Sequence, residues 1–238
     1  MTHLQIVAAT VAVALGAAVQ GSVGFGLSLV AVPLLALIEP RLLPGPLLCV
    51  AIVLTLLLAN RERRSIDFHG VTWGIAGRVP GAVLGATALK VVPQERISLM
   101  IGILVILAVG ISLLPVRIRP TAPRLLGAGI LSGFMGTTAA VGGPPIALLL
   151  QHSPGPQLRG TLSGFFVLGA SVSLLALIVI GRFGLPELWL AFLLLPGIII
   201  GFWASARTVR IMDRGHTRTS VLILSGAAAV AVILRQVL

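Results

Sequence analysis

Long apolar stretches alternate with short polar ones along the whole chain. This pattern predicts membrane segments at about 4–19, 20–38, 42–59, 69–90, 96–114, 124–136, 137–151, 158–180, 184–206 and 219–237. Several approach the roughly 20 residues that a helix needs to cross the hydrocarbon core of a bilayer. The pairs 4–19/20–38 and 124–136/137–151 are shorter, so each is expected to form either two full spans or a re-entrant hairpin. The predicted fold class is an all-α polytopic membrane protein.

Two glycine-rich stretches interrupt the apolar segments. They read QGSVGFGLSLVAVP at 20–33 and SGFMGTTAAVGGPP at 132–145. A constant shift of 112 residues places Gly21, Gly24 and Pro33 on Gly133, Gly136 and Pro145. Closely spaced glycines disfavour a regular helix, because each costs about 1 kcal/mol relative to alanine. Broken segments at corresponding places in two halves are the best sequence indication of a transporter's binding site.

A second set of landmarks repeats at a shift of 116 residues, where Trp73, Pro80-Gly81 and Gly85 match Trp189, Pro196-Gly197 and Gly201. Each half holds five segments, and an odd number per repeat inverts the second half relative to the first. We therefore expect one integral membrane domain made of a first repeat, 1–114, and a second, inverted repeat, 115–238. The alternative is chance similarity among glycine-rich apolar helices.

Composition supports the membrane assignment. The chain is 57% hydrophobic and 10% charged, whereas soluble domains carry roughly 25% charged residues. Its net charge of +11 would suggest nucleic-acid binding in a soluble protein. Here the arginines cluster between apolar segments, which is typical of cytoplasmic loops, so no nucleic-acid partner is expected. The lone cysteine, Cys49, excludes disulfides within the chain.

The basic residues also predict an orientation. Eleven of the seventeen fall in the loops 60–68, 115–124, 151–159 and 207–218, and five fall on the other side. Because cytoplasmic loops carry the excess of Lys and Arg, both termini are expected outside the cytoplasm, in a bacterial-type inner membrane. Membrane lipid is an expected partner, and the chain is expected to be a monomer or a homodimer.

The inverted arrangement has an electrostatic consequence. Segments 20–38 and 137–151 would both begin at a break, and a helix N-terminus carries about half a positive charge with unpaired N–H groups. Two such ends facing one point favour a bound anion. The side chains of Gln20, Ser22, Thr137 and Thr138 would add hydrogen-bond donors, and no acidic residue lies near either break.

Arg78 is the basic residue that lies well inside a predicted span, two positions before Pro80. A charge within the membrane is by default a candidate for function. The alternative is a structural arginine that extends to the interface or binds the carbonyl groups freed by Pro80. No Asp or Glu lies deep in a span, so the carboxylate relays of proton-driven transporters are not visible.

These motifs resemble the sulfite exporter TauE/SafE family of membrane anion transporters. The resemblance is carried by Gln20-Gly21, Gly24-Phe25-Gly26 and Pro33, and by Gly133, Gly136 and Gly142-Gly143-Pro144-Pro145. It implies transport of small sulfur-containing or organic anions such as sulfite, sulfonates or sulfoacetate. The second half has Thr137-Thr138-Ala139-Ala140 where more glycine would fit the pattern, which leaves the substrate open.

The expected function is therefore a secondary anion transporter that works by alternating access. The expected substrate-binding residues are Gln20, Gly21, Ser22, Gly24, Phe25, Gly26, Arg78, Gly133, Gly136, Thr137, Thr138, Gly142, Gly143 and Pro144. A passive anion channel and a structural membrane subunit are the alternatives. An enzyme is not expected, because the sequence has no nucleophile–base pair, metal cluster or buried carboxylate pair in a suitable context. No metal or other cofactor is expected.

Overall fold

The computed structural model of the chain describes residues 1–114, 118–212, 230 and 234. Helices account for the secondary structure of these residues, which contain no strand. The helices are α1 (His3–Val23), α2 (Leu27–Ile38), α3 (Gly45–Arg61), α4 (Phe68–Val91), α5 (Gln94–Leu113), α6 (Ala122–Ala139), α7 (Gly143–Leu150), α8 (Gly155–Val179) and α9 (Leu185–Met212), with single 3-10 turns η1 (Pro40–Leu42) and η2 (Arg63–Ser65). The predicted tenth segment, 219–237, lies outside the described residues.

Four of the described helices are long and apolar enough to cross a membrane: His3–Val23, Glu95–Leu113, Gly155–Val179 and Leu185–Arg207. Their outward faces carry large apolar side chains, among them Val7, Leu175 and Trp189, which are more than half exposed. A soluble protein would place polar residues there, whereas lipid accepts apolar ones. The chain is an integral membrane protein.

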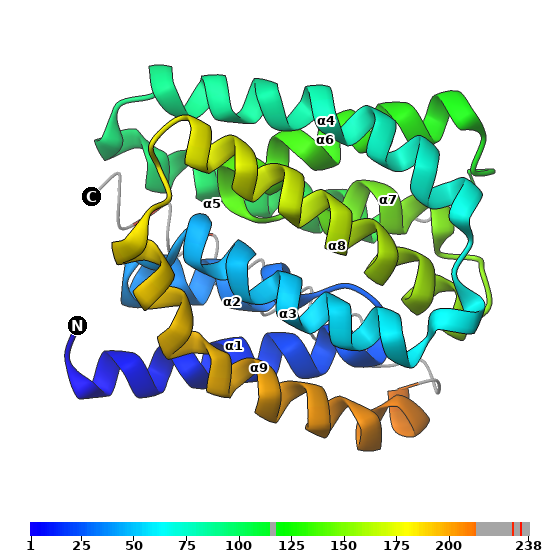
Figure 1. Cartoon of the computed structure of the whole chain (residues 1–238), viewed down its shortest axis with the longest axis horizontal. Helices are drawn as coiled ribbons and strands as arrows, with labels where there is room; N and C mark the ends of the chain where they lie inside the picture. The colour runs from blue at the N-terminus through cyan, green and yellow to red at the C-terminus, as the bar shows by residue number, and fades with distance from the viewer. Residues whose placement is uncertain (115–117, 213–229, 231–233, 235–238) are drawn as a thin grey trace.

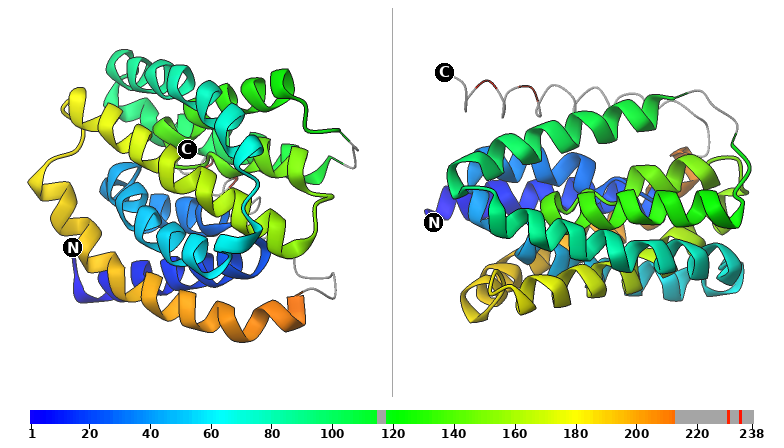
Figure 2. Two further views of the ribbon diagram at one scale, coloured as in Figure 1. Left: turned by 45° about the vertical axis from the view of Figure 1, so that its right-hand side comes forward. Right: turned by 90° about the horizontal axis from the view of Figure 1, so that it is seen from above.

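Successive helices reverse direction along one common axis, as Figure 1 and the view from above in Figure 2 show. The loops before α4, α6 and α8 lie at one end of the bundle, together with the end of α9. We call this the basic end, because it carries Arg61, Arg63, Arg64, Arg119, Arg124, Arg159 and Arg207. The N-terminus and the loops before α3, α5 and α9 lie at the opposite end. The described parts of the loops that charge counting grouped together therefore share one end of the bundle.

Glycines bring two helix pairs into close contact. On α4, a methyl group at Gly81 would lie 2.8 Å from the carbonyl carbon of Ile130 in α6. On α9, a methyl group at Gly197 would lie 2.6 Å from the carbonyl oxygen of Thr10 in α1. Small residues at such contacts let membrane helices approach closely and gain van der Waals contact. α4 thus packs along α6, and α9 packs along α1.

Other glycines in apolar segments do not lie at close helix contacts. A methyl group at Gly110 or Gly127 would meet nothing within 4 Å among the described residues. Gly169 faces the side chain of Arg78, as described below. Sequence spacing alone did not separate packing glycines from outward-facing ones.

The first helix break is narrower than predicted. α1 continues through Gln20, Gly21 and Ser22 to Val23, and the chain leaves the helix at Gly24–Gly26. Gly24 has φ +102° and Gly26 has φ +134°, values that a residue with a Cβ rarely adopts. The predicted boundary between residues 19 and 20 was wrong, because a helix tolerates Gly21 at modest cost and ends where the backbone takes a positive φ.

The second break also lies further along the chain than predicted. α6 continues through Thr137 and Thr138 to Ala139, and the break covers 140–142, with Ala140 at φ +58°. Gly24 and Ala140 end their helices, and Gly26 and Gly142 precede the next ones, so each pair is 116 residues apart. The helix ends therefore correspond at a shift of 116, not 112, in agreement with the Trp73 and Pro80 landmarks.

Candidate functional site

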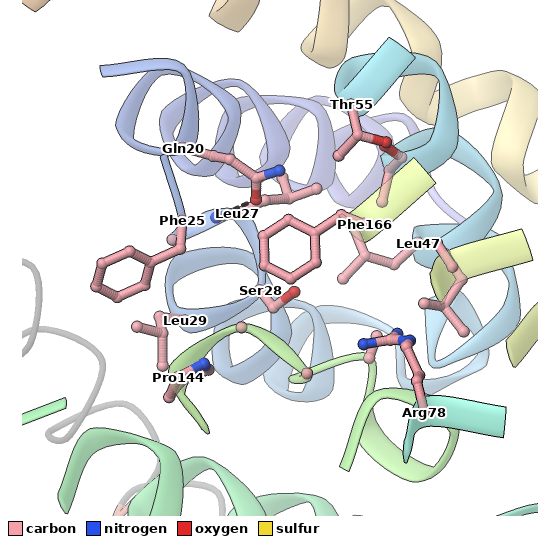
Figure 3. A pocket seen from close by; sticks show the side chains of 17 residues that line it. Gln20, Phe25, Leu27, Ser28, Leu29, Leu47, Thr55, Arg78, Pro144 and Phe166 are labelled. Atoms are coloured by element: carbon pink, nitrogen blue, oxygen red, sulfur yellow. Dashed lines mark hydrogen bonds between the residues drawn. The ribbon is translucent and has the colours of Figure 1, made fainter. Parts of the chain in front are cut away.

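Both helix breaks line one internal cavity of about 40 Å³ (Figure 3). The first break and α2 contribute Gln20, Phe25, Gly26, Leu27, Ser28 and Leu29, and the second contributes Ala140, Gly142, Gly143 and Pro144. The remaining walls are Leu47, Leu48, Ala51 and Thr55 of α3, Arg78 of α4, and Phe166 and Ala170 of α8. One water needs about 10–15 Å³ in such a cavity, so this one has room for a group of a few heavy atoms.

At the first break, the side chain of Gln20 completes the start of α2. Its Oε1 accepts a hydrogen bond from the Leu27 N–H at 3.2 Å, which replaces the acceptor that the first residue of a helix lacks. Ser28 and Leu29 follow in the first turn of α2, where backbone N–H groups have no acceptor within the helix. Both residues line the cavity. The positive end of α2 therefore faces the cavity.

At the second break, α7 offers fewer donors than α2. Pro144 and Pro145 occupy its first turn and have no N–H, which leaves Gly143 as the N–H donor among its first three residues. The two helix N-termini therefore differ in the number of N–H donors in their first turn. The difference is made up by a charged side chain.

That side chain is Arg78, which is 2% exposed and lines the cavity. Its Nη1 donates to Ser132 Oγ at 2.6 Å, and its Nη2 donates to Ser173 Oγ at 3.4 Å. Its Cζ lies 5.2 Å from the centroid of the Phe165 ring, within range of a cation–π contact. The Nε has no hydrogen-bond partner, and no carboxylate of the described residues pairs with the guanidinium.

This geometry differs from the structural alternative, in which Arg78 extends to the interface or binds the carbonyl groups freed by Pro80. The guanidinium does not extend to an aqueous surface, and its hydrogen bonds in the described part of the chain go to hydroxyl groups, not to carbonyls freed by Pro80. Figure 3 shows it directed into the cavity. Arg78 is a buried cation with no counter-ion among the described residues.

Three glycines make room for this guanidinium. A methyl group at Gly136 would lie 2.6 Å from Arg78 Nη2, one at Gly142 would lie 2.7 Å from Nη1, and one at Gly169 would lie 2.7 Å from Cζ. All three distances are shorter than side-chain atoms tolerate, so a Cβ at any of the three would displace the arginine. We call Gly136, Gly142 and Gly169 the arginine slot.

Hydroxyl groups fix the surroundings of the slot. Thr137 Oγ1 donates to Ser173 Oγ at 2.9 Å, Ser132 Oγ donates to the Gly142 carbonyl, and Thr138 Oγ1 donates to the Phe134 carbonyl at 2.7 Å. Thr137 thus supports Arg78 through Ser173 and does not reach the cavity itself.

Seven of the predicted site residues line the cavity: Gln20, Phe25, Gly26, Arg78, Gly142, Gly143 and Pro144. The others, namely Gly21, Ser22, Gly24, Gly133, Gly136, Thr137 and Thr138, do not. Most of them lie within α1 and α6, where a helix turns part of every motif toward its neighbours. Gly21 faces Ser205, Gly24 faces Arg159, and Gly133 faces the backbone of α4.

Sequence reasoning missed Ser28, Thr55 and Phe166. Ser28 lies two residues after Gly26, inside the glycine-rich stretch, and Thr55 is an isolated hydroxyl in an apolar segment. Both could have been found as polar residues at membrane depth. Phe166 belongs to an ordinary apolar helix, and no local signal distinguishes it.

Within the described residues, no group of three His, Cys, Asp or Glu side chains could hold a metal ion. Comparison with known proteins then adds a family. The family model described as sulfite exporter TauE/SafE matches residues 8–232, nearly the whole chain. No curated protein matches the chain, and no solved structure matches it.

Proposed function

The chain belongs to the sulfite exporter TauE/SafE family, and we propose that it is a secondary transporter of small sulfur-containing or organic anions. The proposed substrates are anions of the sulfite, sulfonate or sulfoacetate class. The proposed binding site is the cavity between the two helix breaks. The family consists of transporters and not of enzymes, which agrees with a site that lacks a nucleophile–base pair.

The observation that carries this proposal is the buried guanidinium of Arg78. Removing a cation from water costs several kcal/mol unless an opposite charge compensates it. No carboxylate of the described residues does so, and the cavity beside the guanidinium has room for an ion of a few heavy atoms. A bound oxyanion would supply the missing charge through charge-assisted hydrogen bonds.

Uncharged donors complete the proposed site. The N-terminus of α2 directs the N–H groups of Ser28 and Leu29 toward the cavity, and the Gln20 amide and the Ser28 hydroxyl lie beside them (Figure 3). Helix N-termini favour negative charge. The rings of Phe25 and Phe166 form an apolar wall that would exclude water and contact the uncharged part of an organic anion.

We further propose that 1–114 and 115–238 are inverted repeats that exchange roles during alternating access. Suppose that α1, α3 and α4 correspond to α6, α8 and α9. Exchanging the two halves then turns the packed pair α1–α9 into α6–α4 and the pair α3–α9 into α8–α4, and it leaves the pair α3–α8 unchanged. All five of these helix pairs pack against each other. Corresponding helices run in opposite directions in Figure 1, which supports the inversion.

The second helices of the two hairpins, α2 and α7, are proposed to lie within the membrane without crossing it. α2 has 12 residues and α7 has 8, which corresponds to lengths of roughly 18 and 12 Å. A bilayer core is about 30 Å thick, so neither helix reaches across it. Irregular backbone at that depth is tolerated where it lines a cavity, and both breaks do so.

The test is binding and counterflow in proteoliposomes, with sulfite and a series of sulfonates as probes. We expect Arg78→Leu to weaken anion binding about ten- to hundredfold, because hydrogen bonds to charged groups contribute roughly 1.5–3 kcal/mol. Arg78→Lys should keep part of the affinity, since the charge remains while the planar donor geometry is lost. Unchanged transport in a folded Arg78→Leu protein would refute the assigned role, and transport without trans-stimulation would indicate a channel.

A further inference from the structure

A second group of arginines holds a carboxylate at the basic end of the bundle. Glu62 Oε1 lies 3.1 Å from Arg159 Nε and 3.5 Å from Arg61 Nε, so two guanidinium groups share one oxygen. Arg159 is 6% exposed, and the side chains of Glu62 and Arg61 are 16% and 23% exposed. Among the described residues, two cations share one anion in this cluster, which gives these three side chains a net positive charge.

This cluster contacts the first helix break and the last turn of α1 before it. A methyl group at Gly24 would lie 3.2 Å from Arg159 Cα, and Arg61 Nη2 donates to the Gly21 carbonyl. The same break turns Gln20, next to Gly21, and Phe25, next to Gly24, into the cavity. A few residues of backbone therefore separate the arginine cluster from the proposed anion site.

The outer side of the cluster is hollow. Residues 60–65 line an open depression of about 410 Å³ at the basic end, and Arg61 and Glu62 belong to its wall together with Arg63 and Arg64. Clefts lined by one sign of charge concentrate ions of the opposite sign. Arg61 lines this depression and also contacts Gly21, so the cluster lies between the depression and the end of α1.

We propose that Arg61 and Arg159 form a second anion-binding site, on the path between the cavity and the basic end, and that the Glu62 carboxylate occupies it between transport events. Arginine binds carboxylates and sulfur oxyanions through the same charge-assisted hydrogen bonds, so a small oxyanion can replace Glu62. The carboxylate returns when the anion leaves, which keeps both guanidinium groups paired. This inference rests on the proposed function.

The alternative is an ion pair that only fastens the loop before α4 to α8. A second anion site and a purely structural ion pair predict different changes in the half-saturating sulfite concentration. Glu62→Gln removes a competing anion and should lower the half-saturating sulfite concentration about two- to fivefold, as expected from the energies of partly exposed ion pairs. Arg159→Gln removes a binding group and should raise that concentration by a similar factor, and Arg159→Lys should raise it less.

The measurement is sulfite-driven current from full-length protein on solid-supported membranes, with melting temperatures recorded without sulfite. Opposite shifts for Glu62→Gln and Arg159→Gln support the second site. Shifts in the same direction, or none, overturn it, because both changes break the same ion pair. If Arg159→Gln does not fold, an unchanged or raised half-saturating concentration in Glu62→Gln still overturns it.

Glu39→Gln is the matched control. Glu39 pairs with Arg41 at 2.9 Å at the end opposite the basic end, and the hydrogen bond from Arg41 lowers the pKa of its carboxyl. The substitution removes the same charge, and an ion pair with a single arginine, away from the proposed path, so the half-saturating concentration should not change. A wild-type protein without anion-dependent current, together with an Arg78→Leu variant that binds anions as well as wild type, would overturn the proposed function and this inference with it.

Discussion

At the scale of single residues, three glycines leave the space that the side chain of Arg78 occupies. Arg78 belongs to α4, whereas the glycines of the arginine slot belong to α6, the second break and α8. Sequence reasoning identified Arg78 because a charge inside an apolar span is visible without a structure. It did not connect Gly169 with Arg78, since residues 91 positions apart carry no local signal of contact.

Gly169→Ala tests the slot. The added methyl would lie 2.7 Å from Arg78 Cζ, so we expect the guanidinium to move and anion binding to weaken about tenfold, with overpacking lowering the free energy of unfolding by about 1–3 kcal/mol. Gly164→Ala, on the same helix, is the control, because its methyl would lie 3.5 Å from its nearest neighbour. Binding isotherms and thermal unfolding of both variants provide the comparison.

Combining the change with Arg78→Leu distinguishes a slot from general packing. Once the guanidinium is absent, Gly169→Ala should cause little further loss of affinity, because contacting residues are not additive. An equal loss in both backgrounds would contradict the slot.

At the scale of helices, the existence of the elements was predictable and their ends were not. Every described helix coincides with a predicted apolar segment, because apolar length and glycine-rich interruptions are local properties. The true ends depend on backbone conformation: Ala140 adopts a left-handed φ of +58°, which no local propensity would predict for alanine.

Gly24→Ala tests the first break. With φ +102° and only 3.2 Å to Arg159 Cα, the new side chain should cost about 1–2 kcal/mol of stability from backbone strain alone. Gly127→Ala is the opposite case, since Gly127 lies in α6 and no described residue comes within 4 Å of the added methyl; it should be neutral or stabilising by up to about 1 kcal/mol. Chemical denaturation in detergent measures both. Equal effects would show that the break is not held by its glycine conformation.

At the scale of the whole molecule, charge distinguishes the two ends. The basic end gathers most of the described arginines, and the proposed second anion site lies there. The positive-inside rule predicts that the basic end faces the cytoplasm. Charge counting could not locate the cavity, because the position of the cavity depends on the residues at which α1 and α6 end.

Cysteine labelling in cells tests the orientation. In a Cys49→Ala background, a cysteine at Ser65 of the basic end should react only with a membrane-permeant reagent. A cysteine at Gly184, which is exposed in the loop at the opposite end, should react with an impermeant one. The reverse pattern would place the termini in the cytoplasm and overturn the predicted topology, while the packing of the helices would stand.

The pairing of α1 with α9 has a consequence for biosynthesis. Among the described helices, α1 leaves the ribosome first and α9 leaves it last. The glycine contacts of α9, at Gly197 and Gly201, are made with backbone atoms of Thr10, Ala14 and Ala18 in α1. Until α9 emerges, this face of α1 lacks its partner and must be covered by lipid or by the insertion machinery. A nascent chain that stops before residue 185 therefore contains both helix breaks but cannot complete the packing that holds the first one.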